Sequence, residues 1–268
     1  MVKSITSPVN PLIKKIVQLC DKSKARKDSA TFVIEGKKEI LLALKGGYIP
    51  NTIIFNPTIV GYNSLLDLYG NILFEVEMIE VTNLVYNKIA YREGTEGVIG
   101  IFRSKELLIN QIEIDKPDPL ILVAEAPEKP GNIGALLRTA DAAGVDLFML
   151  ANPNTDIYNP NIIRSSVGTV FTNQVAIGSS SQIITFLKER KIRIYCAIPD
   201  PDSVSCYKYD FKGPTAIVVG TESSGLSQEW INSADAKLVI PMKGQIDSLN
   251  VSVSAAILIF EAIRQRSR

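Results

Sequence analysis

Histidine is absent from the 268 residues of this chain. Serine or cysteine nucleophiles that depend on a histidine base are therefore excluded, and so are nearly all zinc sites. Any proton transfer must use Glu, Asp, Lys, Tyr, Cys or water. A reaction that needs little acid–base assistance suits such a chain best.

Long hydrophobic runs are missing as well. No apolar stretch reaches the roughly 18–20 residues of a membrane span, and the opening MVKSITSPVNP lacks the apolar core of a signal peptide. The cysteines Cys20, Cys196 and Cys206 are scattered and odd in number, so no disulfide framework is expected. These features predict a cytoplasmic protein with no membrane partner.

Excess charge of one sign is also lacking, because the formal net charge is only +1. The first 40 residues differ, with nine Lys and Arg against four Asp and Glu. Within them Lys22, Lys24, Arg26 and Lys27 form a basic cluster. Such a cluster is typical of a loop that contacts nucleic-acid phosphates. A solvated surface loop is the alternative interpretation.

Two domains are expected from the order of the predicted elements. Residues 1–104 predict a small α/β domain, and 105–119 predict a linker that is charged and ends in prolines. In residues 120–268, strands and helices alternate, which indicates a mostly parallel sheet with helices on both faces. The predicted helices are 11–20, 37–47, 83–90, 132–143, 160–166, 180–190 and 227–232. The predicted strands are 31–36, 52–55, 72–79, 97–102, 120–126, 146–150, 192–198, 215–220 and 237–242.

The last long segment, SLNVSVSAAILIFEAIR (248–264), has a mixed pattern. Its first half alternates polar and apolar residues as a half-buried strand does, and its second half is apolar as a buried helix is. Ser248 or Asn250 could cap that helix, and a plain cap is one interpretation. Serines at 252 and 254 could bond within the helix or reach a ligand.

Three polar segments, two of which contain glycine, follow predicted strands. They are APEKPGNIGALLRTADAAG (126–144), GTESSGLS (220–227) and the mixed segment. Because open α/β sheets bind ligands at the carboxyl ends of their strands, these segments predict one shared site.

In the first segment, Gly131 and Gly134 flank Asn132 at a helix start, where anions are favoured. Arg138 follows Gly134 by one turn. The spacing does not match the G-x-G-x-x-G of dinucleotide-binding folds. A tight turn followed by a surface arginine is the alternative here, as a turn with a solvated glutamate is for Glu222.

Three of these stretches, in this order, resemble the motifs of the SpoU group (TrmH-like) of the SPOUT superfamily, the knotted S-adenosylmethionine-dependent RNA methyltransferases. They are GNIGALLRTA, VVGTESSGL and IPMKGQIDSLNVSVSAAI. The N-terminal ITSPVNPLIKKI…FVIEGKKEILLALKGG is similar to that group's RNA-binding domain, which has a ribosomal-protein-like α/β fold. The chain departs from the pattern at Glu128-Lys129-Pro130-Gly131, where many members carry Asp-Pro.

The resemblance implies a trefoil knot in 120–268, closed by the last helix. It also implies methyl transfer from S-adenosylmethionine to a ribose 2′-oxygen of RNA, ribosomal RNA first and transfer RNA as an alternative. A homodimer through the C-terminal domain is expected, since a helix over 251–264 would be too apolar to face water on any side. The other function classes are a catalytically inactive RNA-binding or ribosome-assembly protein and a nucleotide-binding oxidoreductase.

The resemblance also assigns residue roles, as follows: Asn132, Arg138, Glu222, Ser248 and Asn250 to catalysis; Gly220, Ile240, Leu249 and Asn250 to the cofactor; Arg164 to RNA phosphate. Glu222 is expected to hold Arg138 or a substrate donor, and Arg164 could instead be a surface arginine. An arginine is a poor general base because its pKa exceeds about 12. We therefore expect Arg138 to stabilise a developing alkoxide, with the base role as the alternative.

Overall fold

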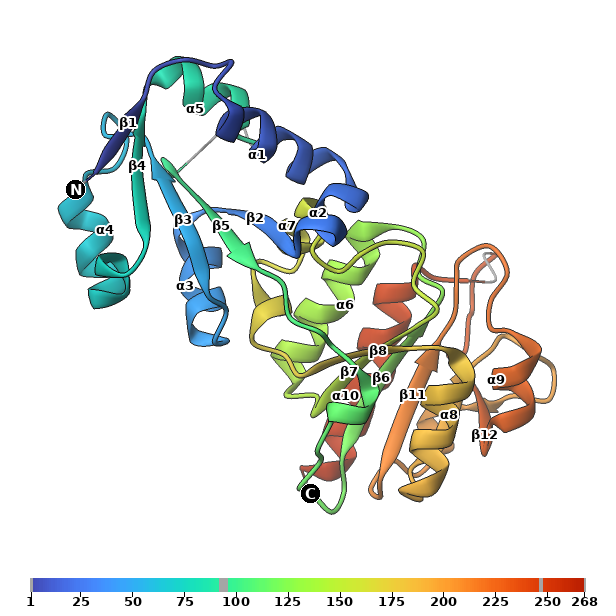
Figure 1. The fold of residues 1–268 in the computed structure, drawn as a ribbon. Coiled ribbons are helices and arrows are strands. Elements are labelled where there is room, and N and C mark those ends of the chain that lie inside the picture. Colours follow the sequence, from blue (N-terminus) through green and yellow to red (C-terminus); the bar gives the residue numbers. More distant parts are fainter. Residues whose placement is uncertain (1, 92–95, 246–247, 268) are drawn as a thin grey trace. The chain divides into compact units, whose positions relative to one another are not determined.

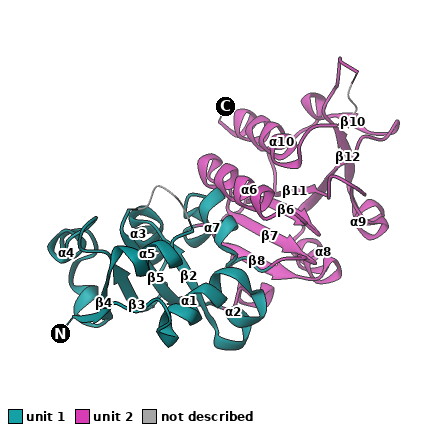
Figure 2. Ribbon diagram, turned by 90° about the horizontal axis from the view of Figure 1, so that it is seen from above, with its two compact units in different colours: residues 1–105, 156–172 teal, residues 106–155, 173–268 magenta. Residues whose placement is uncertain are grey.

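The structure is a computed structural model that describes residues 2–91, 96–245 and 248–267 (Figure 1). The chain divides into two compact units, coloured separately in Figure 2. Unit 1 comprises Met1–Lys105 and Asp156–Thr172, and unit 2 comprises Glu106–Thr155 and Asn173–Arg268. None of the helices in the described ranges is long and apolar enough to cross a membrane.

Unit 1 contains a five-stranded sheet in the order β1-β4-β3-β5-β2, in which β5 runs antiparallel to both of its neighbours. One face of this sheet is covered by the apolar sides of α1 and α5, which share a core with the strands. The strands are β1 (Lys3–Ile5), β2 (Thr31–Glu35), β3 (Pro50–Phe55), β4 (Glu77–Val81) and β5 (Val98–Arg103). The helices are α1 (Pro11–Asp21), α2 (Ser23–Ser29), α3 (Lys37–Lys45), α4 (Tyr62–Tyr69), α5 (Asn83–Ile89) and α7 (Pro160–Ser165).

Unit 2 contains a seven-stranded sheet in the order β10-β12-β9-β11-β6-β7-β8, with every neighbouring pair parallel. Helices α8 and α9 pack on one face, and α6 and α10 lie against each other on the opposite face (Figure 2). The strands are β6 (Leu120–Glu125), β7 (Leu147–Ala151), β8 (Val175–Gly178), β9 (Arg193–Ala197), β10 (Val204–Ser205), β11 (Thr215–Val219) and β12 (Ala236–Val239). The helices are α6 (Pro130–Ala143), α8 (Ser180–Glu189), α9 (Gln228–Ser233) and α10 (Val251–Arg266).

The fully buried central strands explain why sequence patterns predicted this sheet. Strands β6, β7 and β11 are buried at every position, as strands covered on both faces must be. Their near-continuous apolar runs are bounded by glycine or charged residues, which marks their ends. The α/β class and the mostly parallel sheet with helices on both faces are thus confirmed.

The segment 156–172 departs from the predicted division into 1–104 and 120–268. It lies between β7 and β8 in sequence but belongs to unit 1. Asp156 forms an ion pair with Arg26 at 2.6 Å, and the Tyr158 ring stacks on Phe32 with centroids 4.3 Å apart. The predicted linker also differs, because residues from Glu106 onward belong to unit 2, where Ile109 packs against the core.

Three local predictions differ from the structure. The strand predicted over 72–79 forms only from Glu77, where β4 starts, because α4 ends at Tyr69, Gly70 takes a φ of +68° and a 3-10 turn occupies Gly70–Phe74. Three residues of the basic cluster lie on helix α2 rather than in a loop, and Lys22 is the N-cap of that helix. The alternating start of the 248–264 segment forms no strand, because the Asn250 side chain caps α10 and Val251 is already helical.

Candidate functional site

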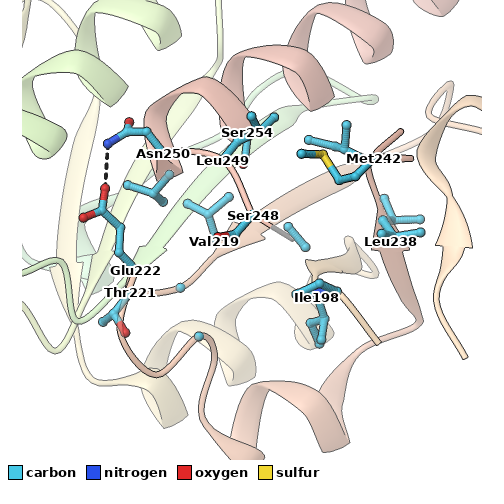
Figure 3. Close-up of a pocket in the computed structure, with 17 residues that line it drawn as sticks. Ile198, Val219, Thr221, Glu222, Leu238, Met242, Ser248, Leu249, Asn250 and Ser254 are labelled. Carbon is cyan, nitrogen blue, oxygen red and sulfur yellow. Dashed lines mark hydrogen bonds between the residues drawn. The ribbon is translucent and has the colours of Figure 1, made fainter. Parts of the chain in front are cut away.

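The carboxyl ends of β9, β11 and β12 in unit 2 open onto a cavity of about 480 Å³ (Figure 3). Its lining comes from four stretches of chain, 197–199, 219–225, 238–242 and 248–254. Three of them directly continue a strand, and the fourth leads into α10. A parallel sheet places such strand ends along one edge, which is where ligands bind in this fold class.

The walls of this cavity are largely apolar. Ile198, Leu238, Met242 and Leu249 supply side chains to it, as Figure 3 shows. Apolar walls with a few polar groups are typical of sites that bind a small organic molecule.

Gly220 must be glycine for this loop to form. A Cβ at this position would lie 2.3 Å from the backbone carbonyl carbon and oxygen of Gly225. The two loop ends are joined by hydrogen bonds from Thr221 N to Gly225 O at 3.1 Å and from Gly225 N to Thr221 O at 3.2 Å. Gly225 has a φ of +67°, which glycine adopts at no steric cost. The result is a closed loop that presents Glu222 beside the cavity.

A polar cluster joins the three predicted motifs at this edge. The Asn132 Nδ2 donates to Glu222 Oε1 at 3.2 Å, and the Asn250 Nδ2 donates to the same oxygen at 2.6 Å. The Asn250 Nδ2 also lies 3.2 Å from Asn132 Oδ1. These residues come from the start of α6, the loop after β11 and the start of α10.

Lys129 completes the cluster from the solvent side. Its Nζ forms an ion pair with Glu222 Oε2. This ammonium, followed by the hydrogen bonds from Asn132 and Asn250, lowers the pKa of Glu222 below its ordinary value. Glu222 is therefore a carboxylate at neutral pH and an acceptor for every donor around it.

Asn250 has two structural tasks. Its side-chain oxygen accepts from Ser252 N at 3.0 Å and from Ser252 Oγ at 2.6 Å, which caps the first turn of α10. Its amide nitrogen is thereby turned toward Glu222. The plain cap and the ligand-site interpretation of this residue are thus compatible in one geometry.

A buried carboxylate anchors the end of the loop after β11 through hydrogen bonds. Glu125, at the end of β6 and 5% exposed, accepts from Ser227 N at 2.8 Å and from Ser227 Oγ at 2.6 Å. Its Oε1 also accepts from Ser180 Oγ at 3.1 Å. Ser180 and Ser227 lie at the starts of α8 and α9, where helix dipoles stabilise a negative charge.

Neither Glu125 nor Lys129 was assigned a role from the sequence. A signal existed for Glu125, since it is a charged residue that ends the apolar run LILVAE. For Lys129, the sequence indicates only that it belongs to a loop that departs from the family pattern.

Several predicted site residues lie together. Gly220, Ile240, Leu249 and Asn250 line the cavity, as do Ser248 and Glu222. Asn132 lies in a smaller adjoining cavity that Glu222 also lines. Arg138 is different: it is exposed on α6 and lines neither cavity. Of the two partners expected for Glu222, Arg138 or a substrate donor, Arg138 is not among its contacts, which are Lys129, Asn132 and Asn250; the substrate donor stays a prediction.

The residues expected to contact RNA are all in unit 1. Lys22, Lys24 and Lys27 are exposed, and so is Arg164 at the end of α7. The predicted RNA contact of Arg26 is wrong, because its side chain is 4% exposed and its guanidinium is already paired within the protein. It pairs with Asp156 and donates to the carbonyls of Leu19 and Cys20 at 2.6 and 3.1 Å. It is a structural residue and offers no free charge to a phosphate.

Metal-ligating groups do not gather in the part of the chain that the structure describes, where no cluster of three or more Cys, Asp or Glu is found. The described geometry therefore offers a small-molecule cavity, a polar cluster beside it and an exposed arginine on the neighbouring helix.

Comparison with known proteins gives matches along most of the chain. Residues 119–260 match the model of the SpoU rRNA Methylase family, and residues 10–100 match an MRM3-like substrate binding domain. A 23S rRNA (guanosine-2′-O-)-methyltransferase from Ralstonia nicotianae is 32% identical over 197 residues, which cover 72% of this chain and 78% of that one.

Two solved structures are similar over nearly the full length. An RNA 2′-O ribose methyltransferase has a TM-score of 0.84 and 36% identity, over 99% of this chain and 100% of its own. An AdoMet-bound rRNA methyltransferase from Sinorhizobium meliloti has a TM-score of 0.86 and 29% identity, over 98% of each chain.

Proposed function

Because the chain belongs to the SpoU rRNA Methylase family, we propose that it transfers a methyl group from S-adenosylmethionine to a ribose 2′-oxygen of ribosomal RNA. The observation that carries this proposal is the cavity at the ends of β9, β11 and β12 with the Asn132–Glu222–Asn250 cluster beside it. The ribosomal substrate is supported by the relatives named above. With such a substrate, a cytoplasmic location is part of the same proposal.

The cavity fits the proposed cofactor. Its volume of about 480 Å³ is within the range of small-molecule sites. Ile198, Leu238 and Leu249 suit an adenine ring, while backbone at Gly220 and Ile240 and the side chain of Thr221 provide hydrogen-bonding groups. When bound, S-adenosylmethionine supplies a methyl group that its sulfonium has already activated, so the chain needs no histidine and no metal.

The protein's part is positioning and charge stabilisation. Asn132 and Asn250 orient the loops around the reacting groups through Glu222. Arg138 lies on the same helix as Asn132 and exposes its guanidinium. It binds the ribose or the adjoining phosphate and stabilises the negative charge that develops on the 2′-oxygen as the hydroxyl proton passes to water, since a guanidinium remains charged throughout and its planar fork matches oxyanions.

Unit 1 supplies the RNA-binding surface in this proposal, as an α/β domain of ribosomal-protein-like type. Exposed Lys22, Lys24, Lys27 and Arg164 are the phosphate contacts. In unit 2 we infer the trefoil knot that the SpoU resemblance implies, closed by α10. The packing of α10 against α6 and β11 supports this closure.

A homodimer through unit 2 is also part of the proposal. Helix α10 exposes Val253 and Phe260, 46% and 48% exposed, two turns apart on one side. A second copy would remove this apolar stripe from water. Light scattering at micromolar concentration should give twice the mass of the 29.4 kDa chain, and Phe260→Glu should shift it to the monomer. A monomeric wild-type chain with cofactor bound would contradict the dimer.

The direct test of the function is methyl transfer in vitro. Wild-type enzyme is incubated with tritium-labelled S-adenosylmethionine and, separately, with unmodified ribosomal RNA and transfer RNA. Label should enter the ribosomal RNA. The matched control is Gly220→Val, whose side chain collides with Gly225 and should stop transfer. Binding of RNA without any transfer would instead indicate an inactive RNA-binding protein.

A further inference from the structure

An ion pair links the loop before α6 to the loop after β11. Lys129 and Glu222 lie 93 positions apart in sequence, and their side chains are 67% and 30% exposed. A second polar contact joins the same loops, from Ser223 Oγ to Glu128 Oε1 at 3.4 Å. Glu128 and Lys129, two of the four residues at which this loop departs from the family pattern, therefore both contact the loop that carries Glu222.

The two oxygens of Glu222 have separate partners. Oε1 accepts from the amides of Asn132 and Asn250, and Oε2 accepts from Lys129. The terminal torsion of a glutamate is broad, so the carboxylate plane is set by its hydrogen bonds. Within the described residues, Lys129 is the donor that anchors the second oxygen and so keeps the first one turned toward both amides.

We propose that Lys129 is a positioning residue for the methyl-transfer site, acting through Glu222 by fixing its carboxylate in the orientation that holds Asn132 and Asn250. This inference rests on the proposed function. It assigns the lysine a role in the reaction rather than in general stability. An exposed ion pair contributes little to folding, so its removal leaves the fold intact.

The charges around Glu222 favour this role. Among the described residues, two charged side chains of the loop before α6 lie near Glu222. Lys129 contacts it directly, and Glu128 contacts the neighbouring Ser223. The start of α10 contributes amide and hydroxyl groups without charge. The Lys129 ammonium is the largest cause of the lowered pKa of Glu222. A group with a lowered pKa keeps its charged-form interactions until the pH falls through that lowered value. Without Lys129, the Glu222 carboxylate should become protonated at a higher pH.

The test compares Lys129→Met, Lys129→Arg and the control Lys116→Met. Lys116 forms an exposed ion pair with Asp146, near the amino end of β6. It is therefore a lysine in an exposed ion pair, like Lys129, but at the opposite end of the strand from the site. In Lys129→Met, kcat should fall roughly 10- to 100-fold, the scale of a misplaced reacting group. The acid limb of the pH–rate profile should move to higher pH. Lys129→Arg should restore most of kcat, and Lys116→Met should behave as wild type.

Two results would overturn the proposal. An increase in KM for RNA with kcat and the acid limb unchanged would make Lys129 an RNA phosphate ligand. Wild-type kinetics in Lys129→Met would make the pair a surface feature only. The carboxyl titration of Glu222, followed by carbon NMR without substrate, separates this inference from the proposed function. It must move to higher pH in Lys129→Met even if the wild-type protein methylates nothing.

Discussion

At the scale of single residues, one side chain often serves both fold and site. Asn250 caps α10 with its oxygen and reaches Glu222 and Asn132 with its nitrogen. An aspartate could keep the first contact but not the second, because it has no N–H to donate. The amide is therefore required by the site and not by the helix.

Substitution of Asn250 separates these two tasks. Asn250→Ala should lower the free energy of unfolding by about 1 kcal/mol, the usual cost of losing a cap, and should weaken S-adenosylmethionine binding in calorimetry. Asn250→Asp should keep the stability but weaken binding, since it places a second carboxylate beside Glu222. Unchanged cofactor affinity in both variants would mean that Asn250 is only a cap.

Arg138 is predicted to stabilise the developing alkoxide. Arg138→Ala should lower kcat by about 100- to 1000-fold, as the loss of one such donor does, with S-adenosylmethionine affinity nearly unchanged. Arg138→Lys keeps the charge without the planar fork and should recover part of the rate. The rate should rise with pH in both the wild type and Arg138→Lys. If Arg138→Lys shifts an ionisation limb, the residue is a base instead, and near-wild-type turnover of Arg138→Ala would remove it from the site.

At the scale of elements, the segment 156–172 between β7 and β8 is held in unit 1 by an ion pair and by aromatic packing. Asp156 pairs with Arg26 on α2, and the aromatic rings of Tyr158 and Phe171 pack against Phe32. The Arg26 and Asp156 side chains are 4% and 11% exposed, so neither charge is well solvated if the other is removed. A buried pair of this kind is costly to break from one side.

Asp156→Ala should therefore lower the free energy of unfolding by roughly 3–5 kcal/mol, measured by urea denaturation. Lys27→Met is the matched control, because it removes an exposed charge from the same helix, and it should change stability by less than about 0.5 kcal/mol. Equal stabilities for Asp156→Ala and the wild type would show that the pair does not anchor this segment.

At the scale of the whole molecule, the chain assigns its tasks to different units. The cavity and polar cluster are in unit 2, whereas the exposed lysines of α2 are in unit 1. RNA affinity and cofactor affinity should therefore respond to different substitutions.

A triple variant of Lys22→Glu, Lys24→Glu and Lys27→Glu tests this division. RNA affinity should fall and its dependence on salt should become shallower, by up to about 0.7–0.9 in the log–log slope for each phosphate that the variant no longer neutralises. The S-adenosylmethionine affinity should stay constant, and Arg26 is left in place because it is structural. If RNA binding is unchanged, the lysines only solvate α2.

Sequence patterns were sufficient to predict the structure where it depends on residues that are neighbours along the chain. The buried strands β6 and β11 and the start of α6 are bounded by local signals, and the motif residues Asn132, Glu222 and Asn250 could be placed at strand ends. Contacts between distant segments carry no such signal. The burial of Arg26 depends on Asp156, 130 positions away, and the partner of Glu222 is Lys129 rather than Arg138. The strand predicted from the alternation in 248–254 does not form for a related reason, because a side-chain cap sets the start of the helix there.

The acceptor in the proposed reaction is a ribose oxygen of ribosomal RNA. It can be identified by mass spectrometry of nucleosides from ribosomal RNA that the purified enzyme has methylated, combined with alkaline cleavage mapping. We expect one nucleoside with its added methyl on the ribose fragment, and resistance to alkali at that position because the 2′-oxygen is blocked. A methyl group on a base fragment, or ribosomal RNA that gains none, would contradict the proposed reaction.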